Sequence, residues 1–252
     1  MGKAAQLVLS VVLAVLAGGW IAVGRLATPP LLGWAAVAAT GFAVAGSALA
    51  RERRPELGRG AADFTVFAGV MIGIGSAALV SGGAILLGLV ALAVVVAYSR
   101  LHERRGPLGI VMLAALAGLP FTFGAMAVVR PVAGIVPSIL AAWLQVLRVI
   151  ATDLETESVD RTAGRRTLAV RLGRSRAAVL STVVALAFIP ASLILPARVG
   201  FGGAYFLIAL FVELAVLVTA ARVIVGRMDG ANALLKGAMF VGAVALVAGR
   251  VA

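Results

Sequence analysis

The chain has 252 residues, of which 62% are hydrophobic and only 13% are charged. Soluble domains are about half apolar and about a quarter charged, so this composition excludes an ordinary globular, a disordered or a collagen-like chain. Cysteine is absent and histidine occurs once, so disulfides, thiolate chemistry and histidine-rich metal sites are excluded as well.

Nine apolar stretches follow one another along the chain, each close to the length of about 20 residues that a membrane-spanning helix needs. They are residues 5–24, 31–50, 64–80, 84–99, 109–129, 132–149, 178–197, 203–221 and 233–249. The pattern predicts an all-α, polytopic membrane bundle of about nine transmembrane helices, forming a single domain over residues 1–252. The break Ser81-Gly82-Gly83 favours two helices over one long helix in the uncharged stretch around it.

The formal charge of +12 comes almost entirely from arginine. In a soluble protein such an excess would indicate nucleic acid. Here most of the basic residues fall in alternate loops, as expected when those loops face the cytoplasm. The distribution predicts a cytoplasmic N-terminus, charged loops on the cytoplasmic side of the cell membrane, lipid as the surroundings and no nucleic-acid partner.

The longest loop, residues 150–177, carries most of the polar chemistry. Asp153, Glu157 and Asp160 are spaced i, i+4 and i+7, so they would share one face if the preceding helix continued into the loop. Clustered carboxylates repel one another unless a cation lies between them, and their hard oxygens suit Mg²⁺.

Arginines follow these acids directly, at Arg161, Arg165 and Arg166. Arginine binds phosphate oxygens with two parallel hydrogen bonds. The combination favours a metal-bridged diphosphate at the mouth of the bundle. The alternative is a solvated loop whose acids and bases pair with one another.

The segment 153–173 resembles the second aspartate-rich motif of the UbiA-type prenyltransferase superfamily, which is close to Asp-Ile-x-Asp-x-x-Gly-Asp-x-x-x-Gly-x-x-Thr-Leu-x-x-x-x-Gly. The matching positions are Asp153, Asp160, Gly164, Thr167, Leu168 and Gly173. Thr156 and Val159 depart from the motif, where an acid and a glycine are expected. Glu155 or Glu157 would have to compensate for Thr156.

Two further segments support the resemblance. Residues 148–153 are similar to the Arg-Glu-Ile-x-Lys-Asp segment of the digeranylgeranylglyceryl phosphate synthase branch, without its Glu and Lys. Residues 98–109 resemble the family's loop after the fourth helix. Nine helices also agree with the superfamily.

The first aspartate-rich motif of the family, close to Asn-Asp-x-x-Asp-x-x-x-Asp followed by Arg-Pro, is degenerate here. Arg54-Pro55 matches its end, but small apolar residues replace the aspartates before it. Glu52 and Glu56 are the candidate replacement ligands; the alternative is that they pair with neighbouring arginines.

The resemblance implies an Mg²⁺-dependent transferase that moves a polyprenyl group from a prenyl diphosphate to a lipid or aromatic acceptor within the membrane. Asp153 and Asp160 would be the catalytic pair. The implied metal ligands are Asp153, Glu157, Asp160, Glu52 and Glu56, and the implied substrate-binding residues are Arg148, Arg161, Arg165, Arg166 and Arg104. The degenerate first motif motivates the alternative of a homologue that binds isoprenoid lipid or a membrane partner without turnover.

Overall fold

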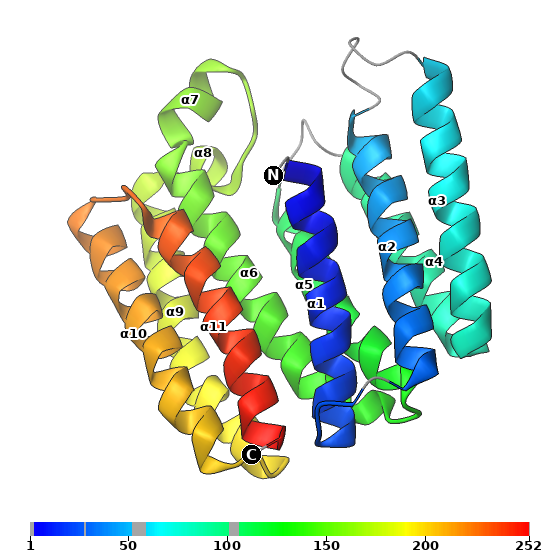
Figure 1. The fold of residues 1–252 in the computed structure, drawn as a ribbon. Helices are drawn as coiled ribbons and strands as arrows, with labels where there is room; N and C mark the ends of the chain where they lie inside the picture. The colour runs from blue at the N-terminus through cyan, green and yellow to red at the C-terminus, as the bar shows by residue number, and fades with distance from the viewer. Residues whose placement is uncertain (1–2, 28, 52–58, 101–105, 252) are drawn as a thin grey trace. The chain divides into compact units, whose positions relative to one another are not determined.

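The computed structural model describes residues 3–27, 29–51, 59–100 and 106–251 (Figure 1). Within them, nine helices of 19 to 25 residues alternate with short connections. They are α1 (Lys3–Val23), α2 (Pro30–Arg51), α3 (Arg59–Val80), α4 (Gly82–Arg100), α5 (Pro107–Ala127), α6 (Ile135–Glu155), α9 (Arg174–Arg198), α10 (Gly203–Val225) and α11 (Ala231–Val251). Shorter elements are the 3₁₀ turn η2 (Pro131–Gly134) and the helices α7 (Glu157–Thr162) and α8 (Leu168–Leu172).

A long helix occupies each of the nine predicted stretches. Eight of them contain apolar stretches of 18 to 25 residues, long enough to cross a membrane, and α4 adds a shorter one at Gly82–Tyr98. The predicted break at Ser81 is confirmed, because the Ser81 hydroxyl accepts the Ala84 N–H at 3.1 Å and so caps the start of α4. The orientation of the termini stays a prediction.

Large apolar side chains remain exposed along the helices, as lipid-facing residues do. Phe64 is 72% exposed, and Leu207 and Phe211 are 69% and 68% exposed. In water such faces would favour aggregation, whereas lipid solvates them. The chain is therefore an integral, multi-pass membrane protein.

Contacts between Cα atoms divide the chain into two compact units. The first comprises residues 1–100 and 116–138, and the second comprises residues 101–115 and 139–250. Helices α5 and α6 each contribute to both units. The single domain over residues 1–252 stays a prediction.

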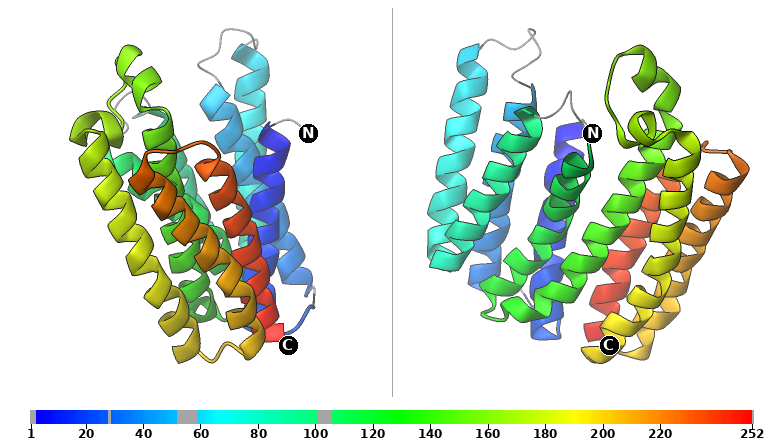
Figure 2. Two further views of the ribbon diagram at one scale, coloured as in Figure 1. Left: turned by 90° about the vertical axis from the view of Figure 1, so that its left-hand side faces the viewer. Right: turned by 180° about the vertical axis from the view of Figure 1, so that it is seen from behind.

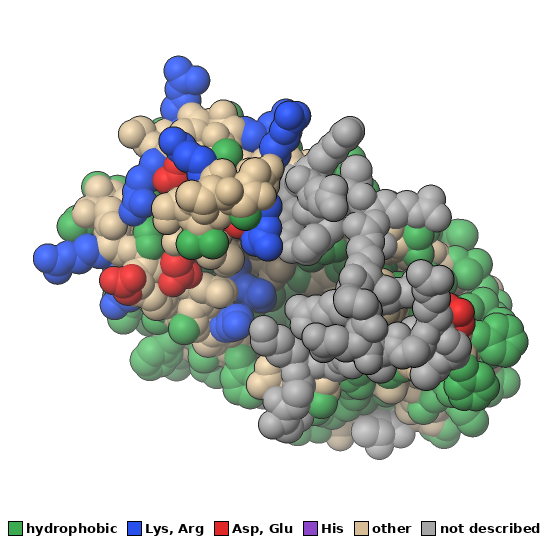
Figure 3. Space-filling model, turned by 90° about the horizontal axis from the view of Figure 1, so that it is seen from above, with side chains coloured by type: hydrophobic (Ala, Val, Ile, Leu, Met, Phe, Trp, Pro, Cys, Tyr) green, Lys and Arg blue, Asp and Glu red, His purple; other side chains and the backbone are tan. Residues whose placement is uncertain are grey.

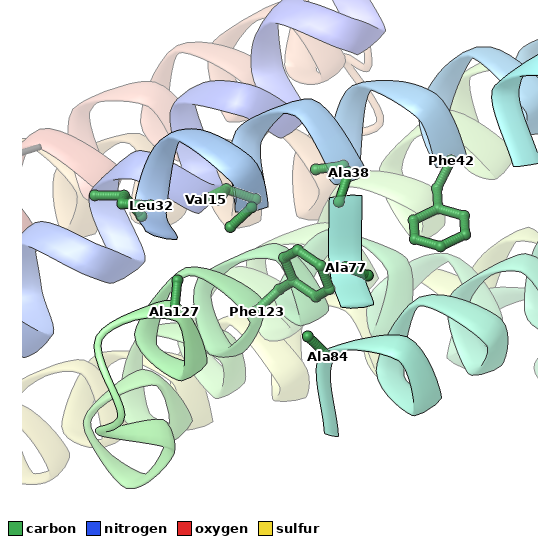
Figure 4. Packing of buried hydrophobic residues seen from close by; sticks show 10 residues of the cluster. Val15, Leu32, Ala38, Phe42, Ala77, Ala84, Phe123 and Ala127 are labelled. Carbon is green, nitrogen blue, oxygen red and sulfur yellow. The ribbon is translucent and has the colours of Figure 1, made fainter. Parts of the chain in front are cut away.

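In the first unit, small side chains allow α1 to α5 to pack closely. Alanines make up six of the ten residues of the buried cluster shown in Figure 4, and Phe42 and Phe123 fill the space between them. Glycines allow still closer approach: a Cβ added at Gly41 would meet the Gly69 carbonyl oxygen, and one added at Gly69 would meet that of Gly41. Helices in lipid associate through such contacts because no hydrophobic force drives them together.

The approach of α1 to α5 gives a stability prediction. A Cβ added at Gly124 would overlap the Val15 carbonyl oxygen and lie 2.9 Å from the Gly19 nitrogen, which is backbone that cannot move aside cheaply. Gly124→Ala is therefore expected to destabilise the protein by about 1–3 kcal/mol, the usual cost of overpacking. A lowered apparent melting temperature in detergent would show this.

Gly33→Ala is the matched control, because an alanine Cβ at Gly33 in α2 meets nothing within 4 Å. It is expected to leave the melting temperature unchanged or to raise it slightly, since alanine favours helix. Equal melting temperatures for both variants would contradict the close α1–α5 contact.

In the second unit, polar side chains supplement the apolar packing of α6, α9 and α10. The Trp143 indole N–H of α6 donates to the Val184 carbonyl of α9 at 3.1 Å. Ser192 of α9 donates to the carboxylate of Glu213 in α10 at 3.0 Å. Figures 1 and 2 show α7 and α8 beyond the end of α6, on the way to α9. This end of the second unit holds the residues of the longest loop.

Candidate active site

The predicted site residues of the longest loop gather at the end of α6, on α7 and in the turn before α8. Figure 3, which looks onto this end, shows Lys and Arg side chains grouped around acidic ones. Asp153, Glu157 and Asp160 are all buried, with 6%, 9% and 4% of their surface exposed. Buried carboxylates are costly unless they are paired or bind a cation, so this burial separates them from ordinary surface acids.

The helix does not continue through all three acids, because α6 ends at Glu155 and α7 begins at Glu157. The single helical face expected from their spacing is therefore wrong. Two threonine hydroxyls lie at the break. The Thr152 hydroxyl donates to the Arg148 carbonyl at 2.9 Å, and the Thr156 hydroxyl approaches the Thr152 carbonyl at 3.0 Å. Such bonds back to the preceding turn compete with the helix ladder and bend it.

The turn after α7 brings Arg165 onto Asp160. The Gly164 N–H donates to the Arg161 carbonyl at 3.2 Å, and the Arg165 N–H donates to the Asp160 carbonyl at 2.9 Å. These are the two bonds of a Schellman motif, which needs a left-handed residue, and Gly164 has φ +67°. The chain therefore reverses at Gly164, and the Arg165 side chain returns to the helix it has just left.

Asp160 is held at both of its carboxylate oxygens. Arg165 Nη1 donates to Oδ1 at 3.0 Å, and the Thr156 hydroxyl donates to Oδ2 at 2.8 Å. The Arg165 side chain is 53% exposed, whereas that of Asp160 is 6% exposed. The guanidinium thus reaches in from water to a buried carboxylate.

The other two acids have different partners. Glu157 forms an ion pair with Arg161, one turn further along α7. Asp153 Oδ2 accepts the Leu168 N–H, the first backbone donor of α8, at 3.0 Å. Asp153 therefore does from 15 residues away what an N-cap side chain usually does, and it holds α8 against the end of α6.

Thr167 belongs to this end of the second unit, although it was not among the predicted site residues. It precedes α8 and is fully buried, and its hydroxyl has no hydrogen-bond partner among the described residues. Buried hydroxyls are almost always paired, in proteins, with another group or with water. The sequence signal that could have identified Thr167 is its match to the Thr-Leu pair of the second aspartate-rich motif.

Of the remaining predicted arginines, the structure describes Arg148 and Arg166. Arg166 is exposed and forms no ion pair within the described ranges. Arg148, in α6, donates to the Gln145 side-chain oxygen at 3.3 Å. Glu52, Glu56 and Arg104 lie outside the described residues.

The donors at this end fit a hard divalent cation by type. The three buried carboxylates offer hard oxygen donors, which Mg²⁺ prefers, and each oxygen of Asp160 keeps a lone pair beyond its present partner. In the ranges that the structure describes, no three acidic or histidine side chains come together as a ready-made metal site. Asp153, Glu157 and Asp160 as metal ligands therefore stay a prediction, and arginines neutralise two of them here.

A bundle of membrane-length helices, with buried acids and exposed arginines at the end of one of them, defines a multi-pass membrane protein with a polar acid–arginine cluster. The chain belongs to the UbiA prenyltransferase family, whose sequence profile matches residues 53–244. This confirms the family to which the motif at Asp153 pointed.

One relative is the digeranylgeranylglyceryl phosphate synthase of Halobacterium salinarum, which is 35% identical over 184 residues. The match covers 72% of this chain and 66% of that protein, so this chain spans just under two thirds of the relative's length.

Solved structures share the fold. The apo structure of a UbiA homologue from Aeropyrum pernix K1 superposes with a TM-score of 0.81 at 18% identity, over 98% of each chain. A UbiA homologue from Archaeoglobus fulgidus bound to GPP and Mg²⁺ gives a TM-score of 0.60 at 14% identity, over 99% of each chain. At these identities the likeness concerns the fold, and it confirms the all-helical membrane bundle.

Proposed function

We propose that this UbiA chain is a prenyltransferase that moves a polyprenyl group from a prenyl diphosphate to an acceptor within the membrane, with Mg²⁺ as cofactor. The observation that carries the proposal is the buried group of Asp153, Glu157 and Asp160 beside Arg161 and Arg165. Relatives named for prenyl transfer, and a family member solved with a prenyl diphosphate and Mg²⁺, support it.

In the proposed reaction, the main contribution of the protein is electrostatic stabilisation of the leaving group. The bond between the allylic carbon and the diphosphate oxygen breaks, and its electron pair leaves with the diphosphate. A new bond then forms to the acceptor nucleophile, which loses its proton. Mg²⁺, when bound by the carboxylates, would supply charge stabilisation for the leaving diphosphate.

This chain's own residues contribute in two ways. Arg161 and Arg165 are 62% and 53% exposed at their side chains, so their guanidinium groups can exchange a carboxylate for a phosphate without leaving the site. The apolar helices provide surroundings for the isoprenoid tail and keep water from the allylic cation.

The acceptor that we propose is a glycerophosphate lipid, because the relatives are synthases of digeranylgeranylglyceryl phosphate. An aromatic acceptor, as in quinone synthesis, is the second choice. The membrane that we propose is the cell membrane, with the acid–arginine end on the cytoplasmic side, where the positive-inside rule places basic loops.

The test is transfer of a radiolabelled prenyl diphosphate by the full chain in detergent, with a prenylated glycerol phosphate or an aromatic acid as acceptor. We expect product with the lipid acceptor only, and loss of product when EDTA removes Mg²⁺. Product with the aromatic acceptor alone would overturn the choice of acceptor. No product with either acceptor would overturn the proposed activity.

A second candidate function has an observation in its favour. The aspartates of the first motif are missing, and the arginines already neutralise two carboxylates of the second. Both features are also expected of a homologue that binds isoprenoid lipid or a membrane partner without turnover. Binding of the labelled diphosphate without product in the same assay would favour it.

A further inference from the structure

We propose that Thr156 is a positioning residue for Asp160: its hydroxyl sets the orientation in which the Asp160 carboxylate meets a divalent cation. The inference rests on the proposed function, because it assigns Asp160 to the cation. The motif carries an acid at this position. Thr156 therefore replaces a side chain that can ligate a metal by one that donates a hydrogen bond.

The geometry gives Thr156 this role directly. Its hydroxyl lies 2.8 Å from Asp160 Oδ2 and 3.0 Å from the Thr152 carbonyl oxygen. A hydroxyl carries one proton, so these two acceptors compete for it. The shorter bond goes to the carboxylate, which is also the stronger acceptor because it is charged.

The rotation of the Asp160 carboxylate is then determined from two sides. Thr156 binds one oxygen and Arg165 the other, at 2.8 and 3.0 Å. When the arginine leaves for a phosphate, as the proposed function requires, Thr156 alone keeps the carboxylate in place.

Residues that orient metal ligands usually contribute 10- to 100-fold, as an order of magnitude, to metal affinity. Thr156→Val keeps the shape of the side chain and removes the donor, so it is expected to weaken cation binding by about 10-fold or more. Thr156→Ser restores the hydroxyl and is expected to bind within about threefold of the unaltered chain, since the donor is the same group.

Thr162 offers a matched control, because it is the last residue of α7, the short helix that Thr156 precedes. Its hydroxyl is exposed and bonds only to backbone carbonyls, those of Ser158 and Val159, at 3.3 and 2.9 Å. Thr162→Val therefore makes the same chemical change without touching a carboxylate. It is expected to leave cation affinity unchanged.

The measurement is Mn²⁺ binding to the purified full chain in detergent, followed by the EPR signal of the free ion, without any prenyl diphosphate. Mn²⁺ serves as the probe because it takes the same oxygen ligands as Mg²⁺. Circular dichroism on each variant controls for folding. In the transfer assay, Thr156→Val should raise the Mg²⁺ concentration for half-maximal rate more than it lowers the rate at saturating Mg²⁺.

The outcomes separate the two proposals. Equal Mn²⁺ affinity for Thr156→Val and Thr162→Val would overturn the positioning role, even if the unaltered chain transfers prenyl groups normally. Weaker binding by Thr156→Val, with rescue by Thr156→Ser, would support it even if no transfer is detected. Absence of Mn²⁺ binding by the unaltered chain would overturn the inference, because Asp160 would then hold no cation.

Discussion

Asp153→Asn is expected to abolish prenyl transfer while leaving the fold intact. The asparagine oxygen can still accept the Leu168 N–H, now bonded to Asp153 Oδ2 at 3.0 Å, so α8 stays in place. What disappears is the negative charge of a proposed metal ligand. Loss of one such contact costs several kcal/mol, which corresponds to a fall in kcat/KM of about a thousandfold.

Asp229→Asn is the control for this change, because Asp229 is exposed in the turn between α10 and α11 and has no proposed role. It is expected to retain full activity. Melting curves of both variants should match that of the unaltered chain. An Asp153→Asn variant that keeps a tenth or more of the activity would contradict the assignment of Asp153 to the metal.

Removing Glu52 and Glu56 together is expected to have an effect of similar size. The two are the only acids between Arg51 and Gly60, where the family carries its first aspartate-rich motif. If catalysis survives in this chain, other carboxylates must replace the lost aspartates as ligands of the Mg²⁺ that would balance the charge of the diphosphate. The double alanine variant should therefore lose orders of magnitude in kcat/KM, again about a thousandfold.

Glu103→Ala serves as the comparison, since it removes an acid from a neighbouring loop without a proposed role. Both variants are measured in the transfer assay at saturating Mg²⁺ and again over a range of Mg²⁺ concentrations. Full activity of the double variant would assign Glu52 and Glu56 to the surface, paired with the arginines around them. The first metal site would then be absent or would use other residues.

The nine spans were predictable because a membrane imposes a length and a composition on each helix separately. The break between α3 and α4 is an example: Ser81 caps the following helix and two glycines follow it, so the signal is local. The turn at Gly164 is equally local, because a Schellman motif involves only the last turn of α7 and two residues beyond it.

The end of α6 shows where local reasoning failed. The spacing of Asp153, Glu157 and Asp160 suggested one helical face, but α6 ends at Glu155, α7 begins at Glu157, and the Thr156 hydroxyl between them donates to Asp160. Helix propensity does not predict which acceptor a threonine hydroxyl binds, because that depends on the groups that the folded chain brings near it.

The sequence by itself determined the class of the protein, the number and approximate limits of its spans, its family and the segment in which its acids and arginines meet. Only the tertiary structure decided that Asp153 meets the first amide of α8, whereas the pairs of Arg161 with Glu157 and of Arg165 with Asp160 join residues four and five apart along the chain. The physical reason is range. Hydrophobicity and capping act over one helix turn or one span, whereas the contact from Asp153 to Leu168 joins residues 15 apart and exists only once α8 has docked.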